Sequence, residues 1–138
     1  MSLEANKAIF TRMINELFND KNMASADDLF TPDATVPSIP DTPPGPEGAR
    51  QIAGMFLSAF PDLQVSIDYI VAEGDRVFGR MSQHATHQGT FFGIPATQRS
   101  VEFTEMGIVR IENGKIAETW FDTDLFGLMM QIMPVATH

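Results

Sequence analysis

The amino-acid sequence predicts an α+β fold in which helices pack on one face of a curved antiparallel sheet. Three observations support this prediction. Apolar residues repeat at helical spacing early in the chain, the repeat changes to strict alternation after Pro61, and Asn113-Gly114 is typical of a tight hairpin turn. Helices that precede a continuous run of strands are typical of this class.

The first 60 residues carry two long helical patterns, separated by a proline-rich segment. Apolar residues from Phe10 to Phe18 share one helix face, and Ser25-Ala26-Asp27-Asp28 begins a short helix that buries Leu29 and Phe30. Six prolines fall within residues 31–46, so an extended loop is expected there. The second long helix begins at Gly45-Pro46-Glu47-Gly48, because proline suits the first helical turn.

Four strands and a terminal helical segment follow. The alternating patterns predict strands over residues 63–71, 76–87, 99–112 and 115–124. Apolar residues between Leu125 and Met133 then predict one or two helical turns. We expect residues 1–138 to form a single domain.

Composition excludes several classes of protein. The 138 residues include 9 basic and 18 acidic side chains, so the net charge of −9 disfavours binding to nucleic acids or to anionic membranes. No cysteine is present, which excludes disulfides, thiolate catalysis and cysteine-ligated metals. The N-terminal residues do not resemble a secretory signal, so we expect a cytoplasmic protein.

Two carboxylates near the end of the last predicted strand are the first candidates for chemistry. Even-numbered residues share one strand face, so Trp120, Asp122 and Asp124 point the same way. A carboxylate beside an indole in an apolar cavity has its pKa raised by desolvation and can exchange protons near neutral pH. The alternative is an ordinary solvated strand face, and one bulge would reverse which of the two aspartates points inward.

His84 and His87 are the second pair of candidates. They lie three residues apart at the end of a predicted strand, so they face opposite ways. No third ligand follows at a recognisable spacing, so we expect no metal site. Either imidazole alone could orient a substrate or transfer a proton.

Several short motifs, in order and spacing, resemble the SnoaL-like polyketide cyclase family. The resemblance covers nearly the whole chain. It rests on Pro44-Gly45-Pro46-Glu47-Gly48, Ala59-Phe60-Pro61-Asp62-Leu63, Ala72-Glu73-Gly74-Asp75-Arg76-Val77, Thr86-His87-Gln88-Gly89, Phe92-Gly93-Ile94-Pro95-Ala96-Thr97, Arg110-Ile111-Glu112-Asn113-Gly114-Lys115-Ile116, Glu118-Thr119-Trp120 and Asp124-Leu125-Phe126-Gly127-Leu128.

This resemblance implies a fold like that of nuclear transport factor 2, a cone-shaped α+β barrel around one deep apolar pocket. It also implies a homodimer formed through the outer face of the sheet. The family's cyclases close a ring by intramolecular aldol condensation, without a metal or an organic cofactor. The aspartate of the family's Trp-x-x-x-Asp motif, a general acid/base in the pocket, matches Asp124, and His87 matches the family's Thr-His-x-Gly segment.

The leading hypothesis is therefore a cofactor-independent enzyme that acts on an apolar, carbonyl-rich small molecule. Asp124, Asp122 and His87 are the catalytic candidates. The residues expected to contact substrate are Trp120, Phe56, Phe60, Met106 and His84.

Two other interpretations stay open. The first is isomerisation or epoxide hydrolysis in the same cavity, and hydrolysis would need a water activated by Asp122, Asp124 and Arg110. A binding module without chemistry is favoured by Val36, because many relatives carry a histidine just before the proline-rich loop, where this chain has Val36.

Overall fold

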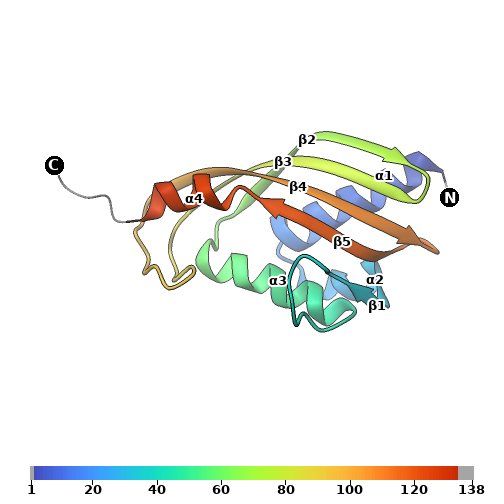
Figure 1. The fold of residues 1–138 in the computed structure, drawn as a ribbon, viewed down its shortest axis with the longest axis horizontal. Helices are drawn as coiled ribbons and strands as arrows, with labels where there is room; N and C mark the ends of the chain where they lie inside the picture. The colour runs from blue at the N-terminus through green and yellow to red at the C-terminus, as the bar shows by residue number, and fades with distance from the viewer. Residues whose placement is uncertain (1, 134–138) are drawn as a thin grey trace.

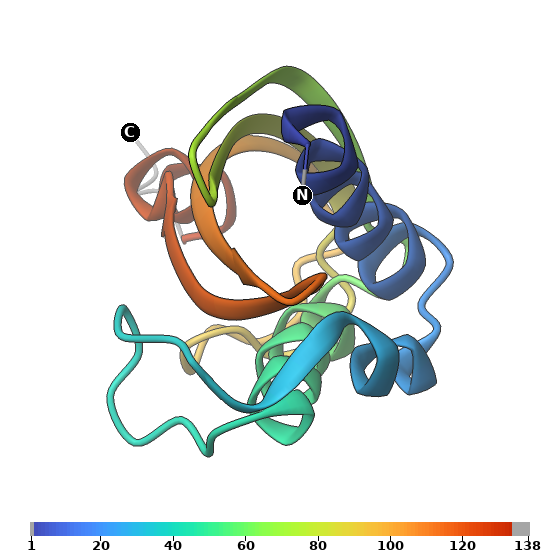
Figure 2. The ribbon, with the colours of Figure 1, turned by 90° about the vertical axis from the view of Figure 1, so that its right-hand side faces the viewer.

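Five strands form one curved sheet in the order β1-β5-β4-β3-β2. The antiparallel strands are β2 (Gln64–Glu73), β3 (Arg76–Thr86), β4 (Ser100–Glu112) and β5 (Lys115–Thr123), and β1 (Phe30–Thr35) pairs parallel with β5. The computed structural model describes residues 2–133. Within them the edge strands β1 and β2 do not pair with each other, so the sheet curls without closing (Figure 2).

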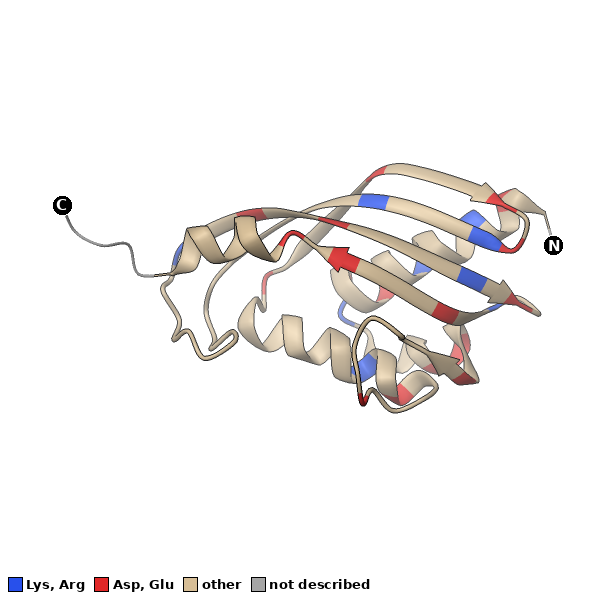
Figure 3. Ribbon diagram, viewed as in Figure 1, with Lys and Arg blue, Asp and Glu red and all other residues tan. Residues whose placement is uncertain are grey.

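The helices lie mainly on the concave side of this sheet (Figures 1 and 2). They are α1 (Leu3–Arg12), the π-helical η1 (Met13–Asn19), the 3-10 turn η2 (Met23–Ser25), α2 (Ala26–Leu29), α3 (Pro46–Ala59) and α4 (Leu125–Ile132). The longest described helix has 14 residues, and none of those within residues 2–133 has the length and apolar character that bilayer crossing requires. In Figure 3 the ribbon positions of Lys and Arg are spread over several helices and strands.

The four expected antiparallel strands and the helix that begins at Pro46 are confirmed, with ends that differ by one or two residues. The hairpin at Asn113-Gly114 has positive φ angles of 51° and 80°, as a tight turn of this type requires.

The segment after Leu29 differs from the prediction. Phe30 does not belong to the short helix but begins β1, and the proline-rich segment becomes a loop only after Thr35. The strand tolerates Pro32 because β1 lies at the edge of the sheet and pairs with β5 alone. The sheet is therefore mixed rather than purely antiparallel.

The first helix changes its winding after Arg12. The backbone N–H of Asp20 donates to the carbonyl of Asn15 at 2.7 Å, the five-residue spacing of a π-helix. At its end, Asn19 Oδ1 accepts from the Val65 N–H at 2.7 Å and Asn19 Nδ2 donates to the Val65 carbonyl at 3.0 Å. This side chain therefore attaches the helix to the exposed edge of β2.

The packing of α1 on the sheet depends on a glycine in the middle of β3. The Phe10 ring is fully buried over Gly79, and a Cβ atom at Gly79 would lie 2.4 Å from two of its ring carbons. A strand glycine at such a position permits close approach of another element. The missing side chain therefore sets how closely α1 lies to the sheet.

We expect Gly79→Ala to destabilise the protein by about 1–3 kcal/mol, because the added methyl group overpacks the contact with Phe10. Gly54→Ala is the matched control. Gly54 lies in α3, where an added Cβ atom would meet no other atom within 4 Å, and this substitution should stabilise the helix by up to about 1 kcal/mol. Urea unfolding measures both changes. Equal stability of the two variants would contradict this account of the packing.

Candidate functional site

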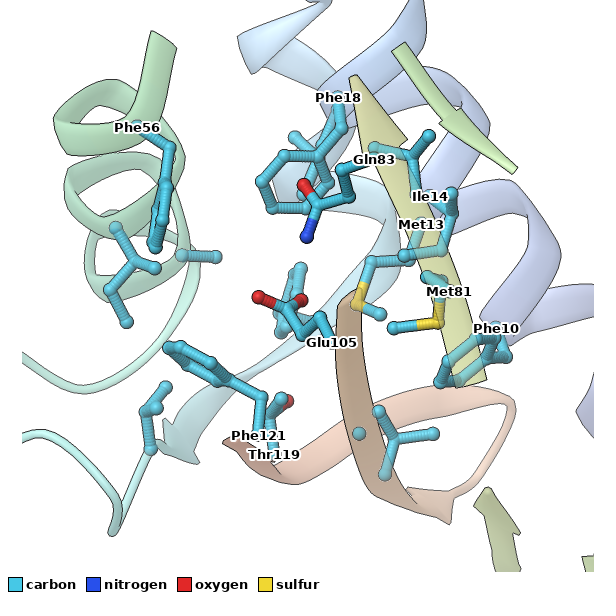
Figure 4. Close-up of a pocket in the computed structure, with 18 residues that line it drawn as sticks. Phe10, Met13, Ile14, Phe18, Phe56, Met81, Gln83, Glu105, Thr119 and Phe121 are labelled. Carbon is cyan, nitrogen blue, oxygen red and sulfur yellow. The ribbon is translucent and has the colours of Figure 1, made fainter. Parts of the chain in front are cut away.

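A mainly apolar cavity lies between the concave face of the sheet and the helices, with a volume of about 60 Å³ (Figure 4). The cavity is large enough to hold several water molecules or a small ligand. Its walls come from α1, η1, α3, all five strands and the start of the proline-rich loop. The lining residues are Phe10, Met13, Ile14, Leu17, Phe18, Phe30, Val36, Ala49, Ile52, Phe56, Val65, Met81, Gln83, Glu105, Gly107, Val109, Thr119 and Phe121.

The π-helical segment contributes adjacent pairs of residues to this wall. Met13 and Ile14 both line the cavity, as do Leu17 and Phe18. These four residues belong to the apolar face that the sequence predicts for this helix, and that face continues through the π-helical segment.

Only three of the lining residues, Gln83, Glu105 and Thr119, carry polar side-chain groups. They come from three neighbouring strands, in which the odd-numbered residues face inward. In the register of β3 and β4, Glu105 lies opposite Met81, and Gln83 is therefore its diagonal neighbour. Figure 4 shows the Glu105 carboxylate and the Gln83 amide directed toward each other across the cavity.

The Glu105 carboxylate has little to stabilise its charge. The Thr123 hydroxyl, directly opposite on β5, donates to Glu105 Oε1 at 2.7 Å. None of the ion pairs between described residues involves Glu105. Burial raises the pKa of the Glu105 carboxyl above its ordinary value, and its contacts with Thr123 and Gln83 oppose the rise only in part.

Gln83 is 5% exposed, and its Nε2 is buried. The amide is close enough to Glu105 to influence its pKa, but Nε2 makes no hydrogen bond of acceptable geometry with a described residue. An unpaired buried donor is unusual and costs free energy. Gln83 therefore presents an unused hydrogen-bond donor at the cavity.

Asp122 and Asp124 do not line the cavity. Asp122 is exposed and lies opposite Met106 on the outer face of the sheet. Asp124 is also exposed, and its Oδ1 accepts the Gly127 N–H at 2.9 Å, which caps the first turn of α4. The catalytic roles expected for these two aspartates stay predictions that their placement does not favour.

The facing of β5 explains this difference. Trp120 and Asp122 share a face, as expected, but it is the outer one, whereas Thr119 and Phe121 point into the cavity. A register shift between Arg110 and Ile111 of β4 changes the pairing with β5, so that both Ile116 and Ala117 are buried. The alternation after this irregularity could not be assigned to a face from the sequence.

Other expected contacts are also separated from the cavity. Met106 is 49% exposed on the outer face, and His84 is exposed there as well. Arg110 forms ion pairs with Glu112 and Glu118, so Arg110, Asp122 and Asp124 are not assembled as a hydrolytic site.

His87 is fully buried and faces away from His84, as the spacing predicted, but it lies outside the cavity lining. Its Nδ1 accepts the Thr97 N–H at 3.2 Å and lies 3.0 Å from the Thr97 hydroxyl oxygen. The ring packs against Phe60, with 5.6 Å between the ring centroids. His87 and Phe60 therefore hold the loop between β3 and β4 against the core.

Two residues that the sequence analysis singled out lie in the cavity wall. Phe56 of α3 lines the cavity, and so does Val36, at the position where many relatives carry a histidine. Val36 adds aliphatic surface where an imidazole would add a proton donor or acceptor. Glu105 is thus the only titratable side chain in the described lining.

Glu105 interrupts the alternating apolar pattern of β4, which is visible in the sequence, but the sequence analysis did not identify it as a candidate site residue. The inward positions of β4 are Val101, Phe103, Glu105, Gly107, Val109 and Ile111. A single carboxylate interrupts an otherwise uncharged face, and Gln83 interrupts the inward face of β3 in the same way. A polar residue that breaks a buried alternation is a stronger indication of a site than one at a strand end.

Comparisons with known proteins agree with this architecture. The model of the SnoaL-like polyketide cyclase family matches residues 8–132. Similar solved structures include TsrD from Streptomyces laurentii, with 27% identity, a TM-score of 0.88 and coverage of 98% of this chain and 99% of that one. No curated protein matches this chain in sequence.

Two further structures are similar at comparable identity. AclR from Streptomyces galilaeus, named as a candidate hydroxylase, has 28% identity, a TM-score of 0.85 and coverage of 98% of this chain and 100% of that one. IdmH from Streptomyces antibioticus, named as a candidate polyketide cyclase, has 29% identity, a TM-score of 0.77 and coverage of 91% and 96%. The fold is the expected one, that of nuclear transport factor 2, and the chain belongs to the SnoaL-like polyketide cyclase family.

Proposed function

We propose that this protein is a cyclase-type enzyme in which Glu105 is the general acid/base. The observation that carries the proposal is a single carboxyl group in an apolar cavity, with its pKa raised by burial and no cationic partner among the described residues. A carboxyl group in this environment has a pKa closer to neutral, where it exchanges protons most effectively.

The proposed reaction is an intramolecular aldol condensation of a carbonyl-rich molecule. The Glu105 carboxylate removes a proton from a carbon flanked by carbonyl groups, and the resulting enolate attacks a second carbonyl carbon of the same molecule. One carbon–carbon bond forms and the attacked carbonyl becomes an alkoxide. Glu105 then returns its proton to the alkoxide, so the carboxylate is regenerated and no cofactor is consumed.

The cavity wall supports this chemistry. Phe56, Phe121 and Met81 supply apolar surface around Glu105, which excludes water and strengthens electrostatic interactions with a developing enolate (Figure 4). In this proposal the acid/base role passes from Asp124 to Glu105. A binding module without chemistry is the second candidate, and the aliphatic Val36 in the wall is the observation that favours it.

We also propose that the protein forms a homodimer through the outer face of the sheet. Val71, Phe78, Ile108 and Trp120 are cross-strand neighbours in one row over β2, β3, β4 and β5. Val71 is 58% exposed and Ile108 is 38% exposed. A contiguous apolar row on a solvent-facing sheet is typical of an interaction surface, and a second copy is the partner that the family resemblance implies.

The test of the acid/base role is the exchange of the α-proton of ethyl 2-methylacetoacetate for deuterium, followed by ¹H NMR in D₂O. We expect Glu105→Gln to lower the protein-catalysed rate by about 10²–10⁴-fold, because the amide cannot accept the proton. Asp124→Asn is the control, since asparagine also caps helices and should leave the rate unchanged. Loss of exchange in Asp124→Asn but not in Glu105→Gln would assign the base to Asp124, and a wild-type protein that does not accelerate the exchange would favour the binding module.

A second prediction needs no substrate. Because the pKa of Glu105 is higher in the folded than in the unfolded protein, ionisation of this group opposes folding. Relative to wild type, Glu105→Gln should gain stability as the pH rises above the ordinary value of 4.5, by at most about 1.4 kcal/mol per pH unit, until the folded-state pKa is passed. Urea unfolding of both proteins from pH 4 to pH 9 measures this difference, and a pH-independent difference would contradict the raised pKa.

The dimer proposal predicts that Ile108→Glu converts the protein to a monomer, because the substitution puts a charge in the middle of the apolar row. Light scattering coupled to gel filtration measures the mass in solution. Gln51→Glu adds the same charge on the exposed surface of α3 and should leave the dimer intact. A wild-type protein that is monomeric at all concentrations would refute the proposal.

A further inference from the structure

We propose that Gln83 is the hydrogen-bond donor that holds the carbonyl oxygen of the substrate, so that the neighbouring carbon faces Glu105. This inference rests on the proposed function of Glu105 and extends it, because it assigns the position and the chemistry of the ligand's oxygen. The ligand it selects is an apolar molecule with a ketone or ester carbonyl, rather than an equally large hydrocarbon.

The first observation is the buried position of Gln83. Gln83 is only 5% exposed, yet its Nε2 has no hydrogen-bond partner of acceptable geometry within the described part of the chain. Amide groups buried inside proteins are nearly always paired. The amide nitrogen is directed toward the Glu105 carboxylate without a hydrogen bond of acceptable geometry, so an oxygen that enters the cavity, from water or from a ligand, can accept from it.

The second observation is the direction of this donor. Gln83 and Glu105 stand on adjacent strands as diagonal neighbours, and both side chains line the same cavity (Figure 4). An oxygen that accepts from Gln83 Nε2 lies beside the carboxyl group that would remove a proton. A carbonyl oxygen and its α-carbon are joined through only one atom, so one carbonyl group matches both side chains.

The third observation is that the cavity has few other polar groups. Apart from Glu105 and Gln83, only Thr119 brings a polar side chain to the described lining, and the rings of Phe56 and Phe121 lie near the Glu105 carboxylate on the side of α3 in Figure 4. When a proton leaves the α-carbon, negative charge develops on the carbonyl oxygen. A fixed N–H donor at that oxygen stabilises the enolate more than the ketone, which lowers the barrier to its formation.

The binding test uses two probes with the same carbon skeleton, acetophenone and ethylbenzene, which differ by the carbonyl oxygen. We expect the wild-type protein to bind acetophenone more tightly, as measured by chemical-shift titration of the ¹⁵N-labelled protein. Gln83→Leu keeps the side-chain volume but removes the donor, so it should lose at least about ten-fold in affinity for acetophenone and retain ethylbenzene. Gln64→Leu, the same substitution at an exposed position of β2, is the control and should change neither affinity.

A second measurement links the donor to turnover. In the exchange assay with ethyl 2-methylacetoacetate, we expect Gln83→Leu to lower the rate by about 10²-fold, the usual effect of removing one such donor. Gln83→Met is a second donor-free variant in case leucine disturbs the fold, and circular dichroism checks both. The inference is wrong if the wild type shows no preference for acetophenone, or if folded donor-free variants retain both the preference and the rate.

The experiments distinguish a failure of the acid/base proposal for Glu105 from a failure of the donor proposal for Gln83. Glu105→Gln should abolish exchange but keep the preference for acetophenone, because Gln83 is still present. If Glu105→Gln leaves exchange intact while Gln83→Leu removes the preference, the acid/base proposal fails and the carbonyl-binding role of Gln83 stands. If Glu105→Gln stops exchange while Gln83→Leu changes nothing, only the inference about Gln83 fails.

Discussion

The contact between Phe10 and Gly79 determines the separation of the helix layer from the sheet. Because Gly79 has no side chain, the Phe10 ring lies directly on the backbone of β3 at this end of the molecule. From there η1 continues along the sheet to Asn19, whose side chain binds both backbone groups of Val65. The cavity lies between these two attachments, where inward-facing residues of β3, β4 and β5 do not meet the helix closely enough to fill the space.

In this apolar cavity the carboxyl group of Glu105 lowers the stability of the fold but suits the proposed proton transfer. A core of hydrophobic residues would be more stable with an apolar side chain at this position, since a buried carboxylate loses its hydration. The Thr123 hydroxyl replaces only part of that hydration. The same loss of hydration raises the pKa of the group above its ordinary value, so the stability given up at this position is the source of the proposed reactivity.

Most of the fold could be predicted from the sequence, because hydrophobic period and turn chemistry are local properties. The strand ends, the helix that begins at Pro46 and the Asn113-Gly114 hairpin all follow from neighbouring residues. The strand β1 could not be anticipated. The six prolines in residues 31–46 predict a loop, and the pairing of β1 with β5 is a non-local property. The side of the sheet on which Trp120 and Asp122 lie could not be predicted for a related reason. A register shift near Ile111 determines which alternating set of residues points inward, and it leaves no clear mark in the sequence.

The position of Glu105 also indicates where a site can be sought in a curved sheet of this kind. On such a sheet, inward residues of several strands converge on one volume, so a carboxyl group can reach the cavity from β4 as well as from the end of β5. The strand that supplies it is therefore not determined by the fold. A better guide to the site is a polar or charged residue at an inward position whose neighbours on the same strand face are apolar. Phe103 and Val109 are buried apolar residues on the same face as Glu105, and the proposed role inside the cavity explains why a carboxyl group lies between them.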